Sequence, residues 1–184
     1  MSTYMISDLH LGHTNCINKI NEMYGLSLDC DSHCELLIES CRKVVHKKDV
    51  IGILGDTCME KPNEYVDRFF QNVPGMKWLV PGNHDTWKVI KYLMDKNYIY
   101  KVIGCMKHHD YMFTHIPIMV SEISIPNKMF YLGNVHGHIH DAGKNALLNK
   151  SMYFNVCANL NNFTPVEFEF IRKTIDVENE IHDR

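Results

Sequence analysis

Residues 4–13 read YMISDLHLGH: a short apolar run is followed at once by a carboxylate and two histidines. The same change from apolar to polar residues recurs four more times. It occurs at VIGILGD (50–56), WLVPGNHD (78–85), YMFTH (111–115) and YLGNVHGHIH (131–140). Short runs rich in β-branched and aromatic residues indicate buried strands. The sequence therefore predicts five strands that each end in polar side chains.

Apolar residues at three- and four-residue spacing predict helices over 31–47, 62–72 and 86–96. Asp31 or Ser32 is the expected N-cap of the first helix, and Pro62 suits the first turn of the second. The second half is expected to consist mostly of strands, at 98–105, 110–114, 129–135 and 152–157. Strand–helix alternation in the first half predicts a parallel, helix-covered sheet. The later strands predict a second, mixed sheet packed on it. The expected fold class is therefore an α/β two-sheet sandwich flanked by helices.

The composition is that of an ordinary globular protein, with 184 residues, 45% hydrophobic and 22% charged. We expect a single domain over residues 1–184. The formal net charge of −3 argues against a broad nucleic-acid surface. The seven cysteines are odd in number and contain no CxxC pair, which is typical of free thiols in a reducing compartment. With no signal-peptide pattern in MSTYMISDLH and no apolar run of 18 residues, a cytoplasmic protein without a membrane segment is expected.

The polar clusters at the strand ends predict a metal site. They hold seven of the 12 histidines, and ligands of open α/β sheets bind beyond the carboxyl ends of the strands. Imidazole and carboxylate groups suit divalent Mn, Fe, Zn or Ni. On an extended chain, residues two apart point to the same face, as Asp8 and His10 would, and likewise His138 and His140. Seven candidate ligands are too many for one four-coordinate zinc, but they fit two ions that share a carboxylate. They are Asp8, His10, Asp56, Asn83, His115, His138 and His140.

Five short blocks of this sequence resemble the signature of the calcineurin-like metallophosphoesterases. The blocks, in chain order, are Asp8-Leu9-His10, Gly55-Asp56, Gly82-Asn83-His84-Asp85, Thr114-His115 and Gly137-His138-Ile139-His140. Any one of them is a weak signal, whereas all five in order are very specific. The string ISDLHLGH, together with His115-Ile116-Pro117 and Thr164-Pro165-Val166, looks most like the small members of bacteria and phages that lack a cap.

The resemblance implies a role for each residue. Asp8, His10, Asp56 and His140 would bind a first metal ion. Asp56, Asn83, His115 and His138 would bind a second, with Asp56 as the bridge. His84 would face the substrate phosphate, and Asp85 would orient the His84 ring. Mn²⁺ is the favoured ion, with Fe, Ni and Zn as alternatives.

These residues predict an enzyme that hydrolyses a small phosphodiester, such as a cyclic nucleotide or dinucleotide, by attack of a hydroxide bridging two metals. A diester is favoured because His84 is placed to protonate a poor leaving group. Three alternatives stay open. They are a phosphomonoesterase, a nuclease like the DNA-repair members of the family, and a non-catalytic scaffold like its retromer subunit. The oligomeric state is left open.

The remaining histidines belong neither to the seven candidate ligands nor to the position of His84. His13 is expected either to contact phosphate, after a turn at Gly12, or only to cap a helix that starts near Asn15. His136 is expected to pack or to support the ligands. His33, His46, His108, His109 and His182 are expected to be structural. Cys34 and Cys41 lie on an apolar helical stripe and are expected in the core.

Overall fold

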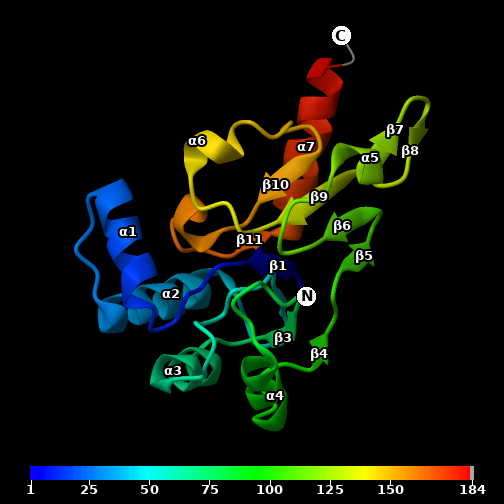
Figure 1. Cartoon of the computed structure of the whole chain (residues 1–184). Helices are drawn as coiled ribbons and strands as arrows, with labels where there is room; N and C mark the ends of the chain where they lie inside the picture. Colours follow the sequence, from blue (N-terminus) through cyan, green and yellow to red (C-terminus); the bar gives the residue numbers. More distant parts are fainter. Residues whose placement is uncertain (183–184) are drawn as a thin grey trace.

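Two β-sheets pack against each other in the computed structural model of the chain, with most helices on their outer sides (Figure 1). The structure describes the backbone of residues 1–182 and the side chains of residues 1–176. The elements in chain order are β1 (Thr3–Ile6), α1 (Thr14–Tyr24), α2 (Cys30–Val44), β2 (Val50–Ile53), α3 (Glu64–Asn72), β3 (Met76–Leu79), α4 (Trp87–Asp95), β4 (Lys101–Val102), β5 (Met106–His108), β6 (Tyr111–Phe113), α5 (Val120–Ile123), β7 (Ser124–Ile125), β8 (Lys128–Met129), β9 (Gly133–His136), α6 (Ala142–Asn145), β10 (Tyr153–Asn155), the 3-10 helix η1 (Ala158–Asn161), β11 (Val166–Glu167) and α7 (Phe168–His182).

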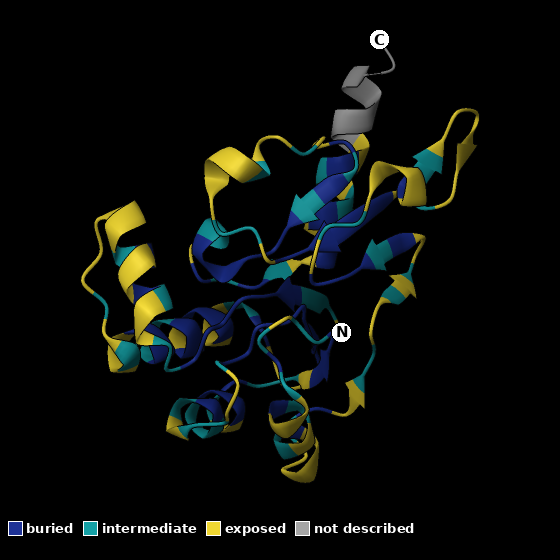
Figure 2. Cartoon of the chain, in the orientation of Figure 1, coloured by how far each residue is buried: buried dark blue, intermediate teal, exposed yellow. Residues whose placement is uncertain are grey.

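The strand order confirms the predicted sandwich. The first sheet has the order β11-β1-β2-β3-β4, in which β1 to β4 are parallel and β11 is antiparallel. The second sheet, β10-β9-β6-β5, is mixed, because β5 is antiparallel to β6 while β6, β9 and β10 are parallel. A small hairpin of β7 and β8 extends from the body, and much of it is exposed (Figure 2).

Alternation along the strands divides the interior into two cores. On β1, Met5 belongs to the core between the sheets, whereas Ile6 belongs to the core under the helices. On β3, Trp78 and Leu79 divide in the same way. This alternation is the two-residue period of a strand. Because both faces of the first sheet are covered, its central strand β2 is apolar and buried at every position, as strands of parallel sheets usually are.

The N-cap residues determine where the helices begin, so α2 begins one residue earlier than predicted and α3 begins two residues later. Asp29, not Asp31 or Ser32, is the N-cap of α2: its carboxylate accepts from the Ser32 N–H at 2.8 Å, and the Ser32 hydroxyl accepts from the Asp29 N–H at 2.9 Å. Pro62 lies outside α3. Asn63 caps that helix through hydrogen bonds from the N–H groups of residues 65 and 66.

Two predicted strands are shorter than expected. Of residues 98–105, only Lys101–Val102 pair with β3. Tyr98 turns back toward α3, where its ring stacks on Phe70 and its hydroxyl donates to Asp67 Oδ1 at 2.8 Å. The predicted strand 129–135 is divided between β8 and β9. The charged C-terminal segment from Lys173 forms the end of α7, and residues 183–184 lie outside the described residues.

Among residues 1–182, no helix is both long and apolar enough to cross a membrane. The parallel strands β1, β2, β3, β6 and β9 all lead into loops at the same edge of the sandwich, as backbone hydrogen bonds between these loops demonstrate. Asp8 N–H donates to Gly55 O at 2.9 Å, and Gly137 N–H donates to His115 O at 2.9 Å. The five polar clusters predicted from the sequence therefore meet at one place.

Candidate metal centre

The loops at this edge hold several residues in the left-handed backbone region. The φ angles of Asp8, His10, Asp56 and His138 are 59°, 42°, 54° and 67°. Such angles are uncommon for residues other than glycine, and they concentrate at functional sites where the surrounding structure maintains them. Four of the seven predicted metal ligands therefore sit on a backbone that the fold holds in an unfavourable conformation.

Two glycines allow the loops to approach each other. A Cβ atom on Gly137 would collide with the side chains of Ser7 and Asp8, and one on Gly82 would collide with Asp56. Glycine at these two positions therefore lets one loop lie directly against the carboxylates of another. This contact explains why a glycine precedes the ligands in the Gly82-Asn83 and Gly137-His138 blocks.

One group of candidate ligands is made by Asp8, His10 and His140, whose ligand atoms lie within 4.8 Å of one another. His140 Nε2 lies 3.2 Å from Asp8 Oδ1, and His10 Nε2 lies 3.8 Å from the same oxygen. The two Nε2 atoms are 3.1 Å apart. Asp8 Oδ1 is buried and has no hydrogen-bond partner in the described residues. A buried carboxylate oxygen facing two imidazole nitrogens is the donor set of a divalent cation.

Neighbouring side chains hold these ligands in place. Asn159 Oδ1 lies 2.9 Å from His140 Nδ1, so that Nδ1 donates and Nε2 is left with its lone pair directed at Asp8. The other oxygen of Asp8 accepts from the His138 N–H at 2.8 Å and from the Cys157 thiol at 2.9 Å. Asn159 and Cys157 were not singled out from the sequence. The signal in the sequence that could have indicated them is the Asn-rich stretch 155–162.

The second group of candidate ligands is made by Asp56, His115 and His138. His115 Nε2 lies 3.4 Å from Asp56 Oδ2 and 3.0 Å from Asn83 Oδ1, and His138 Nδ1 lies 3.3 Å from the same nitrogen. On the far side of its ring, His115 Nδ1 donates to Leu54 O at 2.7 Å. That hydrogen bond fixes the proton on Nδ1, so an ion would bind at Nε2 and displace any proton held there.

Asp56 lies between the two groups. Its Oδ2 atom is 3.4 Å from His115 Nε2 in the second group and 3.8 Å from His10 Nε2 in the first. The structure therefore brings all seven predicted ligands together in the arrangement expected of a shared carboxylate. Whether each of them binds an ion stays a prediction.

The protonation states fit cation binding. Burial lowers the pKa of His10 to about 3, so that its ring is neutral at pH 7, which is the form that binds metal. Burial acts to raise the pKa of Asp8, but the hydrogen bond and charge of His140 hold it well below its usual range. Burial also acts to lower the pKa of His115, yet the hydrogen bond and charge of Asp56 with the charge of Asp8 raise it to about 8. The buried carboxylates of Asp8 and Asp56 are thus available to compensate the positive charge of a bound cation.

His84 lies beside the ligands but outside both groups. Its Nε2 atom is 4.0 Å from Asp56 Oδ2, and about a third of its side chain is exposed. Its ring centroid is 5.6 Å from that of His10. This position at the border of the cavity agrees with a histidine that faces a substrate.

The predicted role of Asp85 is wrong. Its carboxylate has no hydrogen bond to the His84 ring among the described residues. Oδ2 accepts from the N–H groups of Asp56 and Gly82 at 2.8 and 2.9 Å, and Oδ1 accepts from the N–H and hydroxyl of Thr57. Asp85 therefore fastens the loop after β2 to the loop after β3, because the left-handed turn at Asp56 leaves these backbone donors facing inward.

A cavity of about 430 Å³ opens above the ligands, between α1 and α6. His13 lines it, with its ring centroid 5.6 Å from that of His10 and 6.4 Å from that of His84. His13 occupies the N-cap position of α1 but makes no side-chain capping hydrogen bond. The expectation that His13 caps this helix is therefore met by its position and by its backbone carbonyl, which accepts from the N–H groups of Cys16 and Ile17, and not by its side chain. Cys16 also lines the cavity and was missed, although its three-residue spacing from His13 was visible.

The other histidines lie away from the cavity. His136 is fully buried and packs against Tyr153, with centroids 6.0 Å apart. His33 is buried against Phe163. His108 and His109 pack on Phe168. Cys34 and Cys41 lie in the core as predicted.

The structure thus combines an α/β two-sheet sandwich with two groups of candidate divalent-metal ligands at the edge of its parallel strands. The chain belongs to the calcineurin-like phosphoesterase family, which it matches over residues 1–176. The resemblance predicted from the five blocks is thereby confirmed. Family membership identifies the chain as a metal-dependent phosphoesterase that uses divalent ions.

Two relatives match the chain over most of its length. The chain is 25% identical over 181 residues to the uncharacterized protein MJ1445 of Methanocaldococcus jannaschii, covering 94% of this chain and 90% of the relative. The fold itself is shared with the crystal structure of AQ665, a protein of unknown function from Aquifex aeolicus, to which the chain is similar with a TM-score of 0.69 and 25% identity. That match covers 94% of this chain and 98% of the other.

Proposed function

We propose that the protein hydrolyses small phosphodiesters, with a centre of two Mn²⁺ ions bridged by Asp56. The observation that supports this most directly is the position of Asp56 Oδ2. It lies 3.8 Å from His10 in one ligand group and 3.4 Å from His115 in the other, so one carboxylate serves both. Asp8, His10 and His140 would complete one ion's ligands, and Asn83, His115 and His138 those of the other.

Bound ions would neutralise the two buried carboxylates, attract the phosphate and supply hydroxide as nucleophile near neutral pH. The protein's own residues provide orientation and a proton. Asn159 and Leu54 O hold the rings of His140 and His115, so that Nε2 of each faces a carboxylate. Asp85 keeps the Asp56 and Asn83 loops in register. His84, beside the ligands and in contact with the cavity, protonates the leaving alkoxide.

The cavity favours a small substrate. Its volume of about 430 Å³ is near the lower end of the ligand-site range of about 300–1,000 Å³. Lys19 and Lys144 line it beside the metal ligands and add positive charge for an anionic substrate. The chain as a whole has a net charge of −3, which does not favour a long nucleic acid.

A substrate panel tests the proposal. Cyclic nucleotides, dinucleotides and bis(nitrophenyl) phosphate would be compared with nitrophenyl phosphate and nucleoside monophosphates, all with Mn²⁺, Fe²⁺, Ni²⁺ or Zn²⁺. We expect kcat/KM to be at least about tenfold higher for a diester than for any monoester, with Mn²⁺ the best ion. Higher values for the monoesters would establish a phosphomonoesterase instead. Two bound ions without hydrolysis of any ester would favour the scaffold alternative.

A further inference from the structure

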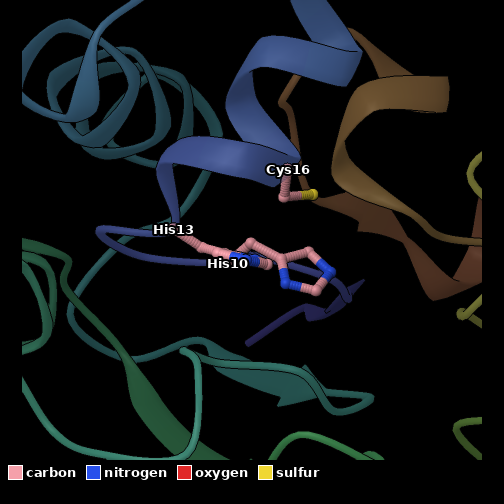
Figure 3. Close-up of side chains that lie close together, drawn as sticks. All are labelled: His10, His13 and Cys16. Carbon is pink, nitrogen blue, oxygen red and sulfur yellow. The ribbon is translucent and has the colours of Figure 1, made fainter.

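His10, His13 and Cys16 form a third group of ligand-type side chains, next to the proposed dinuclear centre (Figure 3). One ring nitrogen of each histidine and the Cys16 Sγ atom all lie within 4.8 Å of one another. His10 and His13 come from the segment between β1 and α1, and Cys16 lies in the first turn of α1, as Figure 3 shows. The three residues follow each other at intervals of three.

One nitrogen of each histidine in this group lacks a hydrogen-bond partner. Nδ1 of His10 and Nδ1 of His13 are both buried without a hydrogen-bond partner in the described residues, and His10 is 97% buried. Unpaired buried polar atoms are rare and call for an explanation such as an ion. The carboxylates of Asp8 and Asp56 lie 3.8 Å from the His10 ring, so the local charge also favours a cation.

We propose that His10, His13 and Cys16 bind one thiophilic divalent ion, such as Zn²⁺ or Cd²⁺, at an inhibitory site. Two imidazoles and one thiolate are a donor set of zinc, with a fourth position left for water. The thiol proton passes to solvent as sulfur binds the ion. Mn²⁺ prefers oxygen ligands, so the thiol makes this group selective for softer ions.

The site excludes the dinuclear centre because both require His10. A neutral imidazole has one nitrogen lone pair, since the other nitrogen holds a proton, so His10 serves one ion at a time. An ion held by His13 and Cys16 would therefore compete with the first ion of the Asp8 group. The inhibition rests on the proposed function, whereas the site itself does not. The shared histidine makes the protein sensitive to thiophilic ions that are present in excess.

The binding test uses Cd²⁺, because a cadmium–thiolate bond has an ultraviolet charge-transfer band that needs no activity. Metal-free wild type would be titrated beside Cys16→Ser, Cys16→Ala and Cys30→Ser. Cys30 is a matched control, since it is also half-buried and near the start of α1, 3.5 Å from Thr14 Oγ1. We expect a band that saturates at one equivalent in wild type and Cys30→Ser and is lost in both Cys16 variants. A band retained in both Cys16 variants would overturn the site.

The inhibition test uses Mn²⁺-loaded protein and measures, for each variant, activity with added Cd²⁺ relative to its own activity without it. We expect half-inhibition of the Cys16 variants to need at least about tenfold more Cd²⁺ than that of wild type, because even the loss of a residue that only supports a ligand lowers metal affinity by about 10–100-fold. Equal sensitivity would overturn the competition for His10. Absence of hydrolysis in all samples would instead contradict the proposed function, while the absorbance titration would still decide the site.

Discussion

The backbone N–H of His84 donates a hydrogen bond to Oδ1 of Asp56 at 2.9 Å. The proposed proton donor is thereby attached to the proposed bridging carboxylate, whose other oxygen faces His115 and His10. Because one oxygen is occupied by the backbone, Asp56 presents only Oδ2 to both ligand groups. The position of His84 relative to the ions is thus determined by the same carboxylate that joins them.

Replacement of Asp56 by alanine should remove both ions. Each ion loses a ligand, and the loop after β3 loses its contact with the ligand groups. We expect wild type to hold two Mn²⁺ per chain and Asp56→Ala fewer than one at equal free Mn²⁺, by elemental analysis. Even residues that only support ligands change metal affinity by about 10–100-fold, so the loss of a shared ligand should exceed this. Asp95→Ala, at an exposed carboxylate on α4, is the control. Two ions retained in Asp56→Ala would contradict the bridge.

Replacement of His84 by alanine should lower kcat by roughly 10²–10⁴-fold, the usual contribution of a general acid, without loss of metal. The loss should be largest for diesters with alkoxide leaving groups and smaller for nitrophenolate, which departs without a proton. Steady-state kinetics on both substrates, with metal content measured on the same sample, checks this. Equal losses for the two leaving groups would instead indicate that His84 stabilises charge on the phosphate.

Most of the site could be predicted from the sequence because each ligand block lies directly after a strand. In a parallel sheet the carboxyl ends of strands meet at one edge, so Asp8, Asp56 and Asn83 had to converge. The partners of Asp85 could not be predicted in this way. They depend on the left-handed backbone at Asp56, whose φ is 54°, and that conformation turns the adjacent N–H groups inward. A residue next to His84 in sequence thus acts on different loops in space.

In the fold, too, features that depend on local sequence were predicted, and features that depend on contacts between distant segments were not. The short apolar strands and the amphipathic helices were predicted because periodicity is local. The start of the strand predicted at 98–105 was not, because Tyr98 lies outside the sheet, where it packs on Phe70 and donates to Asp67 on α3. Such tertiary contacts override local strand propensity. Cys157 and Asn159, which support Asp8 and His140, were missed for the same reason: they are distant in sequence from the side chains they contact.

Replacement of Asp85 by asparagine should lower stability more than it lowers catalysis. The Asn amide cannot accept from all four donors that Asp85 serves, and unsatisfied buried donors cost about 1–3 kcal/mol each. A net loss of about 3 kcal/mol would reduce Tm by roughly 6–12 °C in a chain of this size. Thr57→Val, which removes one of these donors, should cost only about 1 kcal/mol. An unchanged Tm with a large fall in kcat would restore the original expectation that Asp85 orients the His84 ring.

Replacement of His13 by alanine should leave both Mn²⁺ ions bound and lower kcat/KM by about 10–150-fold. His13 is outside both Mn²⁺ ligand groups but lines the cavity beside His10 and His84. A lost hydrogen bond to a charged phosphate is worth about 1.5–3 kcal/mol, which corresponds to that range. Measurement of kcat/KM and of Tm on one preparation decides whether His13 contacts the phosphate. A lower Tm with unchanged kcat/KM would show that His13 serves only the start of α1.

The buried His33 should make the protein sensitive to acid. Burial against Phe163, with no hydrogen bond to Nδ1 in the described residues, lowers the pKa of His33 to about 4, whereas an unfolded histidine has a pKa of about 6.5. Because the folded state disfavours the protonated ring, the stability from the neutral ring is fully present above about pH 6.5 and is lost as pH falls through 4. The difference between the folded and unfolded pKa values corresponds to roughly 3 kcal/mol of stability at the acid limit.

The experiment compares urea unfolding of metal-free wild type and His33→Leu at pH 7, 5.5 and 4.5. The other histidines contribute equally to both proteins. Wild type should lose roughly 2–3 kcal/mol more than the variant between pH 7 and 4.5, and parallel losses would place the acid sensitivity elsewhere.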